Sequence, residues 1–351
     1  MLRVFVYEYT SACDSVALGL PESLQIEGWA MLSAVLKDFC RIPGLEVCTL
    51  LHRRNMFRTC KSCRTIRRDD EPKDFRRLAR SSDYTLIIAP ELDQVLYSRC
   101  RIVEDGPGRL LGPSAAAVQL TGDKLECGKF LRHAGVATPE CFELSGGSLP
   151  DRLTLPAVCK PRYGAGSFST WLVRDPSRLP LSPQAGRGKK DTLDSMQAGR
   201  AEKHILQPFV LGLAVSVAFI ISAKECVALL PAEQHLSEDG RFRYLGGAIP
   251  LAPDIAQRAE HLARRALETI PGLLGFVGVD LVLGEKGDGS EDWVIEINPR
   301  LTTSYIGQRL MTPSNLAQSM LQAASGSSIE PLEWLDNRVT FRSDGSFQMT
   351  A

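Results

Sequence analysis

Two neighbouring segments late in the chain carry oxygen-bearing side chains at strand spacing. Glu296 and Asn298 lie in and just after the apolar run 293–297, which we expect to pair antiparallel with the strand 275–283 that carries Asp280. Residues two apart on a strand point to the same face, so Glu296 and Asn298 face the same side. Two carboxylates and one amide form a donor set made only of oxygen, which suits Mg²⁺ bound together with phosphates, with Mn²⁺ as the alternative ion. The pattern predicts a magnesium–nucleotide site, and the open alternative is a merely polar hairpin edge.

Three basic side chains are placed to contact phosphate groups near this site. Arg300 lies two residues beyond Asn298 on the same face, and its planar guanidinium can bind a phosphate or an acyl-phosphate through two bonds. Lys160 closes a buried strand, so its ammonium group has a defined direction. Lys124 lies at the start of a helix. Either lysine alone is equally well a surface residue, but Asp280 and Arg300 together favour a phosphate site.

A glycine-rich turn and an extended segment complete the predicted nucleotide site. Backbone N–H groups at Gly164, Gly166 and Ser167 can surround phosphate oxygens, because glycine allows close approach of the backbone. The turn joins two strands and does not precede a helix, so it is not a P-loop, and we expect it to act as a lid. The extended segment offers backbone donors and acceptors to an adenine ring and consists of Gln207, Pro208, Phe209 and Val210. The alternative for Phe209 is an ordinary core position.

The first 112 residues alternate between short apolar strands and helical periodicity. This alternation predicts a parallel sheet with helices on both faces. Ligands of such sheets bind at the carboxyl ends of the strands, so Glu8 and Glu91, which follow two of the strands, lie where a substrate is expected. The expected strands are 2–7, 47–51 and 84–89, and the expected helices are 26–39 and 75–80.

The rest of the chain divides into two further units and a tail. Residues 113–204 begin with a helix over 121–133 and continue into the hairpin around the glycine turn and a polar loop at 180–200. Residues 205–325 form the third unit, and residues 326–351 are a tail, which we expect to be partly disordered after residue 330. The expected elements of the third unit are strands at 205–210, 214–221, 225–230, 275–283 and 293–297 and helices at 253–269 and 314–324.

Composition excludes several functional classes. The 351 residues include 41 basic and 41 acidic side chains, so no net field attracts the chain to nucleic acid or to a membrane. No apolar run reaches the roughly 18 residues of a membrane helix, and no signal-peptide pattern opens the chain, so we expect a cytoplasmic protein. The arginine-rich stretch 53–80 is expected to be a solvated face, with an anion-binding surface as the alternative.

The ten cysteines include one close pair, Cys60 and Cys63. With Cys48 and His52 this pair completes a four-ligand set for a structural zinc ion. A single C-x-x-C without a second pair favours unconnected thiols over a metal site.

The order of these parts resembles that of the ATP-grasp superfamily of carboxylate–amine ligases. The resemblance implies an α/β and α+β fold, in which an open parallel α/β domain precedes a split nucleotide-binding unit of two α+β subdomains. The implied nucleotide contacts are Lys124, Lys160, the phosphate loop 164–167 and the adenine-binding hinge 207–210. The implied magnesium ligands are Asp280, Glu296 and Asn298. The implied catalytic residues are Lys160 and Arg300, of which Arg300 stabilises the acyl-phosphate.

One position departs from the pattern of the superfamily. Many members hold the ribose with an acidic residue after the hinge, where this chain has Ala214. Ribose contact is therefore left to Glu202 or Ser216.

Several short segments look closer to one group within the superfamily, the tyramine–glutamate ligases of methanofuran biosynthesis and their bacterial relatives. These segments are 8–9, 26–31, 87–93 and 296–307. The finer resemblance adds Glu27 to Glu8 and Glu91 as expected substrate contacts.

The resemblance implies a reaction in two steps between small-molecule partners. A substrate carboxylate takes the γ-phosphoryl group of ATP, and an amine then attacks the acyl-phosphate to give an amide, ADP and phosphate. Glutamate and an aromatic amine such as tyramine or tyrosine are the expected pair, and a homodimer is left open. The alternatives are an amino-acid or peptide ligase with other substrates and a non-catalytic MgATP-binding module. A dinucleotide-dependent oxidoreductase is disfavoured because no G-x-G-x-x-G follows the first strand.

Overall fold

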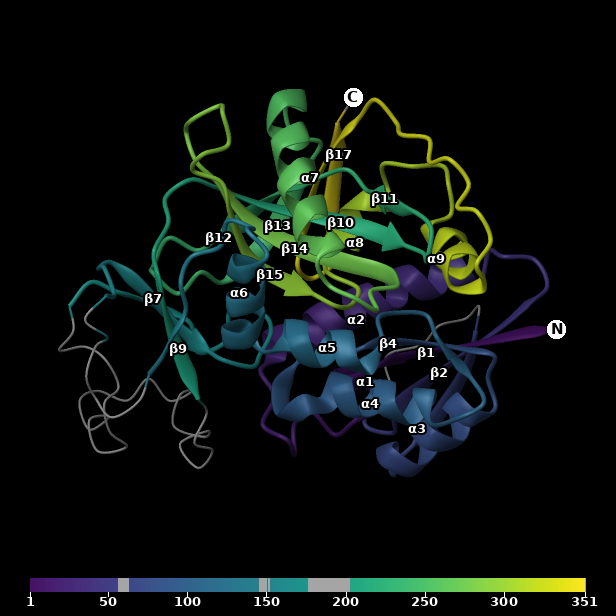
Figure 1. Cartoon of the computed structure of the whole chain (residues 1–351). Helices are drawn as coiled ribbons and strands as arrows, with labels where there is room; N and C mark the ends of the chain where they lie inside the picture. The colour runs from purple at the N-terminus through teal and green to yellow at the C-terminus, as the bar shows by residue number, and fades with distance from the viewer. Residues whose placement is uncertain (56–62, 145–149, 151, 176–202, 351) are drawn as a thin grey trace.

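The computed structural model describes residues 1–55, 63–144, 150, 152–175 and 203–350. Cys60 of the suggested zinc site, the expected loop at 180–200 and Glu202 lie outside these residues. Figure 1 shows three groups of strands within the described part of the chain, with the N-terminal strands at the lower right, β7 and β9 at the left and the largest sheet above them.

The N-terminal group is a parallel sheet of five strands in the order β3-β2-β1-β4-β5, as the sequence predicts. Alternate residues of the central strand pack on opposite faces. Val4 and Val6 contact the long helix α2, whereas Phe5 and Tyr7 pack with residues of α3 and α4. The bounds are β1 (Leu2–Glu8), α1 (Tyr9–Ala12), α2 (Glu22–Phe39), β2 (Leu45–His52), β3 (Arg64–Arg68), α3 (Glu71–Arg80), β4 (Tyr84–Ile88), η1 (Leu92–Gln94), α4 (Val95–Glu104) and β5 (Arg109–Leu110).

The arginine-rich stretch contains a strand that the sequence does not predict. The strands expected in this unit were 2–7, 47–51 and 84–89, but β3 pairs with β2 at the edge of the sheet. An edge strand needs little apolar content because one side of it faces solvent, and Ile66 is the single aliphatic residue in β3. Nearby arginines form surface ion pairs, Arg53 with Asp69 and Arg54 with Asp14. These pairs favour the solvated-face interpretation of the stretch.

The second group is a small antiparallel sheet in the order β6-β9-β7-β8. The hairpin of β7 and β8 around the glycine turn is confirmed. Two helices precede this sheet, and side chains cap both, Ser114 at the start of α5 and Asp123 at the start of α6. The bounds are α5 (Ala115–Gly122), α6 (Lys124–His133), β6 (Phe142–Glu143), β7 (Ala157–Pro161), β8 (Trp171–Val173) and β9 (His204–Pro208).

The third group is an eight-stranded sheet in the order β15-β14-β10-β12-β13-β16-β17, with β11 paired to β10. Alanines of α7 at helical spacing, Ala259, Ala263 and Ala266, cover one face, while α8 and α9 share a core with α2 on the other. The bounds are β10 (Leu213–Ile221), β11 (Cys226–Ala228), β12 (Ala232–Leu236), β13 (Tyr244–Ile249), α7 (Pro253–Glu268), β14 (Gly275–Leu283), β15 (Trp293–Asn298), α8 (Ser304–Gln308), α9 (Leu316–Ser325), β16 (Arg338–Arg342) and β17 (Phe347–Thr350).

The tail is better ordered than expected. We expected partial disorder after residue 330, but β16 joins the large sheet through β13, and β17 pairs with β16. Val339 and Phe341 alternate with exposed residues and bury their side chains completely in the core beneath β13. The expectation of a disordered tail is therefore wrong for 338–350.

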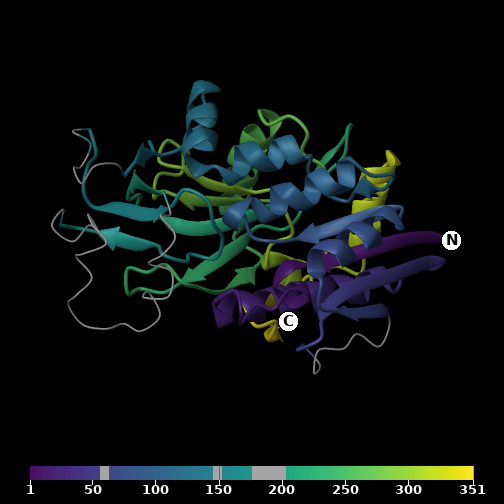
Figure 2. The ribbon, with the colours of Figure 1, turned by 90° about the horizontal axis from the view of Figure 1, so that it is seen from below.

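Helix α2 connects the N-terminal sheet to the large sheet. At its end, the buried Asp38 carboxylate accepts hydrogen bonds from Tyr305 Oη at 2.7 Å and from Arg309 Nε and Nη2 at 2.8 and 2.6 Å. Figure 1 shows this helix, in purple, between the N-terminal strands and the large sheet, and Figure 2 shows it from below. No helix among the residues described above is both long and apolar enough to cross a bilayer.

A methyl group at Gly28 tests the close packing of α2 on β1. A Cβ atom there would lie 2.6 Å from Glu8 Cδ and 2.8 Å from Thr10 Oγ1, both buried. We expect Gly28→Ala to lower the free energy of unfolding by about 1–3 kcal/mol through overpacking. Thermal or urea unfolding measures this change. Gly287→Ala is the control, because its added Cβ meets no atom within 4 Å, and equal stability of the two variants would contradict the packing argument.

Candidate active site

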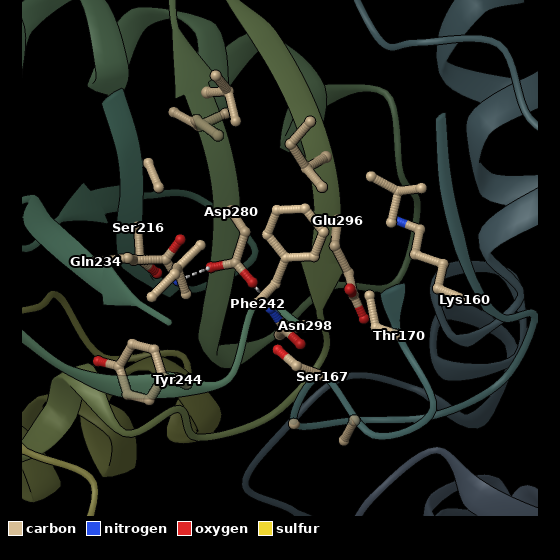
Figure 3. A pocket seen from close by; sticks show the side chains of 18 of the residues that line it. Lys160, Ser167, Thr170, Ser216, Gln234, Phe242, Tyr244, Asp280, Glu296 and Asn298 are labelled. Atoms are coloured by element: carbon tan, nitrogen blue, oxygen red, sulfur yellow. Dashed lines mark hydrogen bonds between the residues drawn. The ribbon is translucent and has the colours of Figure 1, made fainter. Parts of the chain in front are cut away.

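A cavity of about 520 Å³ is lined by residues of the small and the large sheets and of the segments next to them, together with Glu27 of helix α2. Figure 3 shows its acidic cluster on β14 and β15, with Lys160 on one side and Gln234 and Tyr244 on the other. The predicted site residues that line it are Glu27, Lys124, Lys160, Gly164, Gly166, Ser167, Gln207, Pro208, Phe209, Val210, Asp280, Glu296, Asn298 and Arg300. Glu8 and Glu91 are not among the lining residues of the described chain.

The acidic cluster is built by the pairing of β14 with β15. Asp280 lies directly opposite Glu296, and Gly278 lies opposite Asn298, so the predicted antiparallel pair is confirmed. Two amides hold the Asp280 carboxylate: Asn298 Nδ2 donates at 2.9 Å and Gln234 Nε2 donates at 3.0 Å (Figure 3). Burial, with the charge of Glu296, raises the pKa of Asp280 to about 6. The cluster thus presents oxygen atoms whose negative charge calls for a cation.

Two lysines face this cluster from the other side of the cavity. Lys124 Nζ lies 3.0 Å from Glu296 Oε1 and donates to the carbonyl oxygen of Gly164 at 2.7 Å. It therefore joins the start of α6 to both β15 and the glycine turn. Lys160 is buried on β7; burial lowers the pKa of its ammonium group, and Glu296 opposes that effect. Burial alone would raise the pKa of Glu296, but Lys124 and Lys160 hold it below its usual value.

Arg300 forms a buried ion pair that the sequence did not reveal. Its Nε donates to Glu91 Oε1 at 2.9 Å and its Nη2 to Glu91 Oε2 at 3.3 Å, while Nη2 also approaches Asn298 Oδ1 at 3.4 Å. Glu91 follows β4, so this pair connects the N-terminal sheet to the end of β15. Burial alone would lower the pKa of Arg300, but Glu91 raises it above its usual value. The guanidinium is therefore charged and held in one orientation.

The other two acidic residues predicted to contact substrate differ in their surroundings. Glu8 is buried and caps α1, accepting hydrogen bonds from Thr10 N at 2.9 Å and Ser11 N at 2.8 Å. Glu27 lines the cavity from α2. Burial raises the pKa of Glu27 to about 7, against the lowering effect of Arg300.

The glycine turn and the hinge also line the cavity. Gly166 has φ of +71°, a conformation that glycine adopts without strain, and Leu24 of α2 lies beside it. The Gln207 side chain is engaged elsewhere, donating to the carbonyl oxygen of Pro139 at 3.4 Å. The ring of Phe209 packs 5.9 Å from the ring of Phe242, and both line the cavity, so Phe209 is not an ordinary core residue.

Profiles of two domain families match the chain. The family described as an ATP-grasp domain matches residues 121–304, and the family described as a pre ATP-grasp 3 domain matches residues 45–118. The first match alone spans more than half of the chain. The chain belongs to the ATP-grasp family. It is accordingly an ATP-dependent carboxylate–amine ligase, which uses ATP and a divalent metal and releases ADP.

Curated relatives and solved structures agree with this assignment. The chain is 26% identical over 329 residues to a tyramine–L-glutamate ligase of Methanocaldococcus fervens, which covers 92% of this chain and 94% of the relative. It is 27% identical over 209 residues to a D-alanine–D-alanine ligase of Desulforudis audaxviator, covering 54% of this chain and 63% of that protein. An ATP-grasp superfamily protein from Archaeoglobus fulgidus shares the fold, with a TM-score of 0.70, 23% identity and coverage of 97% of this chain and 92% of that one.

The sequence patterns do not predict some of the residues that line the cavity of this ATP-grasp ligase. Gln234 lines it from β12, Tyr244 from β13 and Phe242 from the turn between these strands. No spacing signal marks these residues, because β12 and β13 meet the site through strand pairing and not through a local motif. Ala214 and Ser216 both line the cavity on β10, and Glu202, the other suggested ribose contact, lies outside the described residues.

The zinc alternative finds no support in the part of the chain that the structure describes. Cys60 lies outside it, Cys48 is buried in β2, and His52 Nε2 lies 3.7 Å from Asp69. No group of three His, Cys, Asp or Glu side chains placed to hold a metal occurs among the described residues.

Proposed function

We propose that the chain joins glutamate to tyramine or a related aromatic amine through an acyl-phosphate, within the biosynthesis of a methanofuran-like cofactor. The supporting observation is the convergence of the Asp280 cluster, Lys160 and Arg300 on one cavity of an ATP-grasp ligase. This chain and a tyramine–L-glutamate ligase match over more than nine-tenths of the length of each, which supports this choice of substrates. Tyrosine is the alternative amine.

The metal ligands in this proposal are Asp280, Glu296 and Asn298. Their donor set consists of carboxylate and amide oxygens, which fits Mg²⁺ and also Mn²⁺. When bound, the ion supplies charge that offsets the phosphate oxygens of ATP. Asn298 and Gln234 orient the Asp280 carboxylate for this task.

The basic residues in this proposal act on the transferred phosphoryl group. Lys124 and Lys160 contact phosphate oxygens, and the turn with Gly164, Gly166 and Ser167 closes over them and excludes water from the acyl-phosphate. Arg300 stabilises the negative charge that develops at the acyl-phosphate when the amine attacks. Because Glu91 fixes its guanidinium, Arg300 needs no rearrangement when this charge appears.

The adenine in this proposal lies against the hinge. The backbone of Gln207, Pro208, Phe209 and Val210 receives its edge, and the rings of Phe209 and Phe242 pack against its face. Ser216 is the described residue that we propose for the ribose, in place of the acidic residue missing at Ala214.

The division of the chain into units also remains a proposal. We retain an N-terminal α/β unit at 1–112, a central lid subdomain at 113–204, a C-terminal subdomain at 205–325 and a tail at 326–351. The sheets cross these boundaries. Strand β9, most of which lies in the third unit, belongs to the small sheet, and β16 and β17 of the tail belong to the large sheet.

The proposal is tested by incubating the purified chain with ATP, Mg²⁺ and pairs of acids and amines. We expect ADP release with glutamate and tyramine, and a product whose mass equals the sum of the two substrates minus one water. Asp280→Asn provides the inactive control. If ADP release does not exceed background with any pair, and the variant and the wild type do not differ, the proposed ligase activity is refuted.

A second candidate is an amino-acid or peptide ligase with the same mechanism. The similarity to a D-alanine–D-alanine ligase over 54% of this chain favours keeping it. The mass of the product separates the two candidates, because a dipeptide and a glutamyl-tyramine differ in mass.

A further inference from the structure

Three of the charged residues that line the cavity are held by neighbouring side chains. Lys124 pairs with Glu296, Arg300 with Glu91, and Asp280 accepts hydrogen bonds from two amides. Glu27 differs from these three residues. Within the described residues, its carboxylate has no hydrogen bond and no ion pair, although it lines the same cavity.

A half-buried carboxylate without a partner is costly. Transfer of an ionised carboxylate out of water destabilises the protein unless a cation or several donors replace the lost hydration. Arg300 is the cation whose charge reaches Glu27, but its guanidinium already binds Glu91 through two hydrogen bonds. The protein thus leaves in the cavity a carboxyl group whose charged form a cationic ligand would stabilise.

Glu27 lies where the second substrate must approach. Leu24, three residues earlier on the same face of α2, lies next to Gly166 of the phosphate-covering turn. Arg300 and Tyr244 also line this part of the cavity, and the charge of Glu27 acts on the hydroxyl of Tyr244. The carboxylate is therefore close to both the proposed lid and the proposed acyl-phosphate site.

We propose that Glu27 anchors an ammonium subsite, which binds the protonated primary amine of a substrate beside Arg300. This proposal rests on the proposed function. The ammonium group donates to the Glu27 carboxylate, and the ring of Tyr244 supplies an aromatic surface near the same charge. Two substrates carry this chemistry, the attacking amine and the α-ammonium group of an amino-acid donor.

Glu27→Gln tests the subsite, because glutamine keeps the shape of the side chain and removes its charge. We expect the KM for the substrate that binds Glu27 to rise by about 10- to 100-fold, the range for a hydrogen bond to a charged group. The KM for ATP stays unchanged. Glu22→Gln is the matched control, since Glu22 lies on the same helix, is exposed and does not line the cavity.

Two partial assays identify which ammonium group is bound. Hydroxylamine is uncharged at neutral pH and replaces the amine, so hydroxamate formation reports the acid and ATP alone. If the attacking amine binds Glu27, the variant forms hydroxamate from glutamate normally and loses affinity for tyramine. If the donor binds there, the KM for glutamate rises in the hydroxamate assay, while glutarate, which lacks the α-ammonium group, is used equally by both proteins.

Unchanged KM values for both glutamate and tyramine in the variant would overturn the subsite while leaving the proposed function intact. Absence of hydroxamate with the wild type would instead count against the proposed function. In that case the rise in melting temperature with tyramine or glutamate tests the subsite without turnover. Stabilisation of the wild type but not of Glu27→Gln supports it, and equal stabilisation of both proteins, or of neither, overturns it.

Discussion

Asp280→Asn is expected to reduce kcat by about 100-fold or more, because a metal-bound phosphoryl transfer loses several kcal/mol of charge stabilisation when one of the proposed anionic ligands is removed. The structure adds a second cost. Asn298 and Gln234 both donate to the Asp280 carboxylate, so an amide at this position places a donor opposite one of these donors. Steady-state rates of ADP release at saturating substrates measure the effect.

The metal dependence separates loss of ligation from general damage. We expect the variant to need a higher Mg²⁺ concentration for half-maximal rate, whereas the opposed donors lower its melting temperature without changing the Mg²⁺ requirement. Asp336→Asn is a suitable control, since Asp336 is exposed and does not line the cavity. A variant with normal kcat and an unchanged Mg²⁺ requirement would remove Asp280 from the metal site.

Arg300 is expected to have the second large effect, but a simple truncation would be misleading. Arg300→Ala leaves the buried Glu91 carboxylate without its partner, which destabilises a protein by about 3–5 kcal/mol when a buried pair is broken. The informative variant is Arg300→Ala combined with Glu91→Gln, which removes both charges. We expect this double variant to fold and to lose about 100- to 1,000-fold in kcat, the range for removal of one preorganised electrostatic group.

The complete cycle of single and double variants separates stability from catalysis. We expect Arg300→Ala alone to unfold at a lower temperature than the double variant, because only the single variant retains an unpaired charge. The KM for ATP should change little in either. A double variant with wild-type turnover would mean that Arg300 serves only to hold the N-terminal sheet against β15.

The acidic cluster could be predicted because its determinants are local. Asp280, Glu296 and Asn298 lie on two apolar strands joined by a short polar loop, and alternation along each strand decides which side chains share a face. Pairing of the strands then needs no information from elsewhere in the chain. The glycine turn and the hinge lie in similarly short, self-contained segments.

The remaining contacts could not be predicted because they depend on packing between distant segments. The partner of Arg300 lies 209 residues earlier in the chain, and both residues are acceptable in isolation as ordinary charged side chains. The strand β16 has only Val339 and Phe341 as buried positions, too few to produce a clear periodic signal. Tertiary pairing with β13 makes it a strand.

The contacts of α2 restrict which segments can be exchanged with a relative to change the substrate specificity of this enzyme. Its first turns lie against the glycine turn, and its last turn binds Tyr305 and Arg309 through Asp38. A chimaera that exchanges only residues 1–112 with a relative would separate Asp38 from these partners and Glu91 from Arg300. A chimaera that keeps its function should therefore take the N-terminal unit and residues 300–309 from the same parent. These two stretches are distant in the sequence but must be exchanged together.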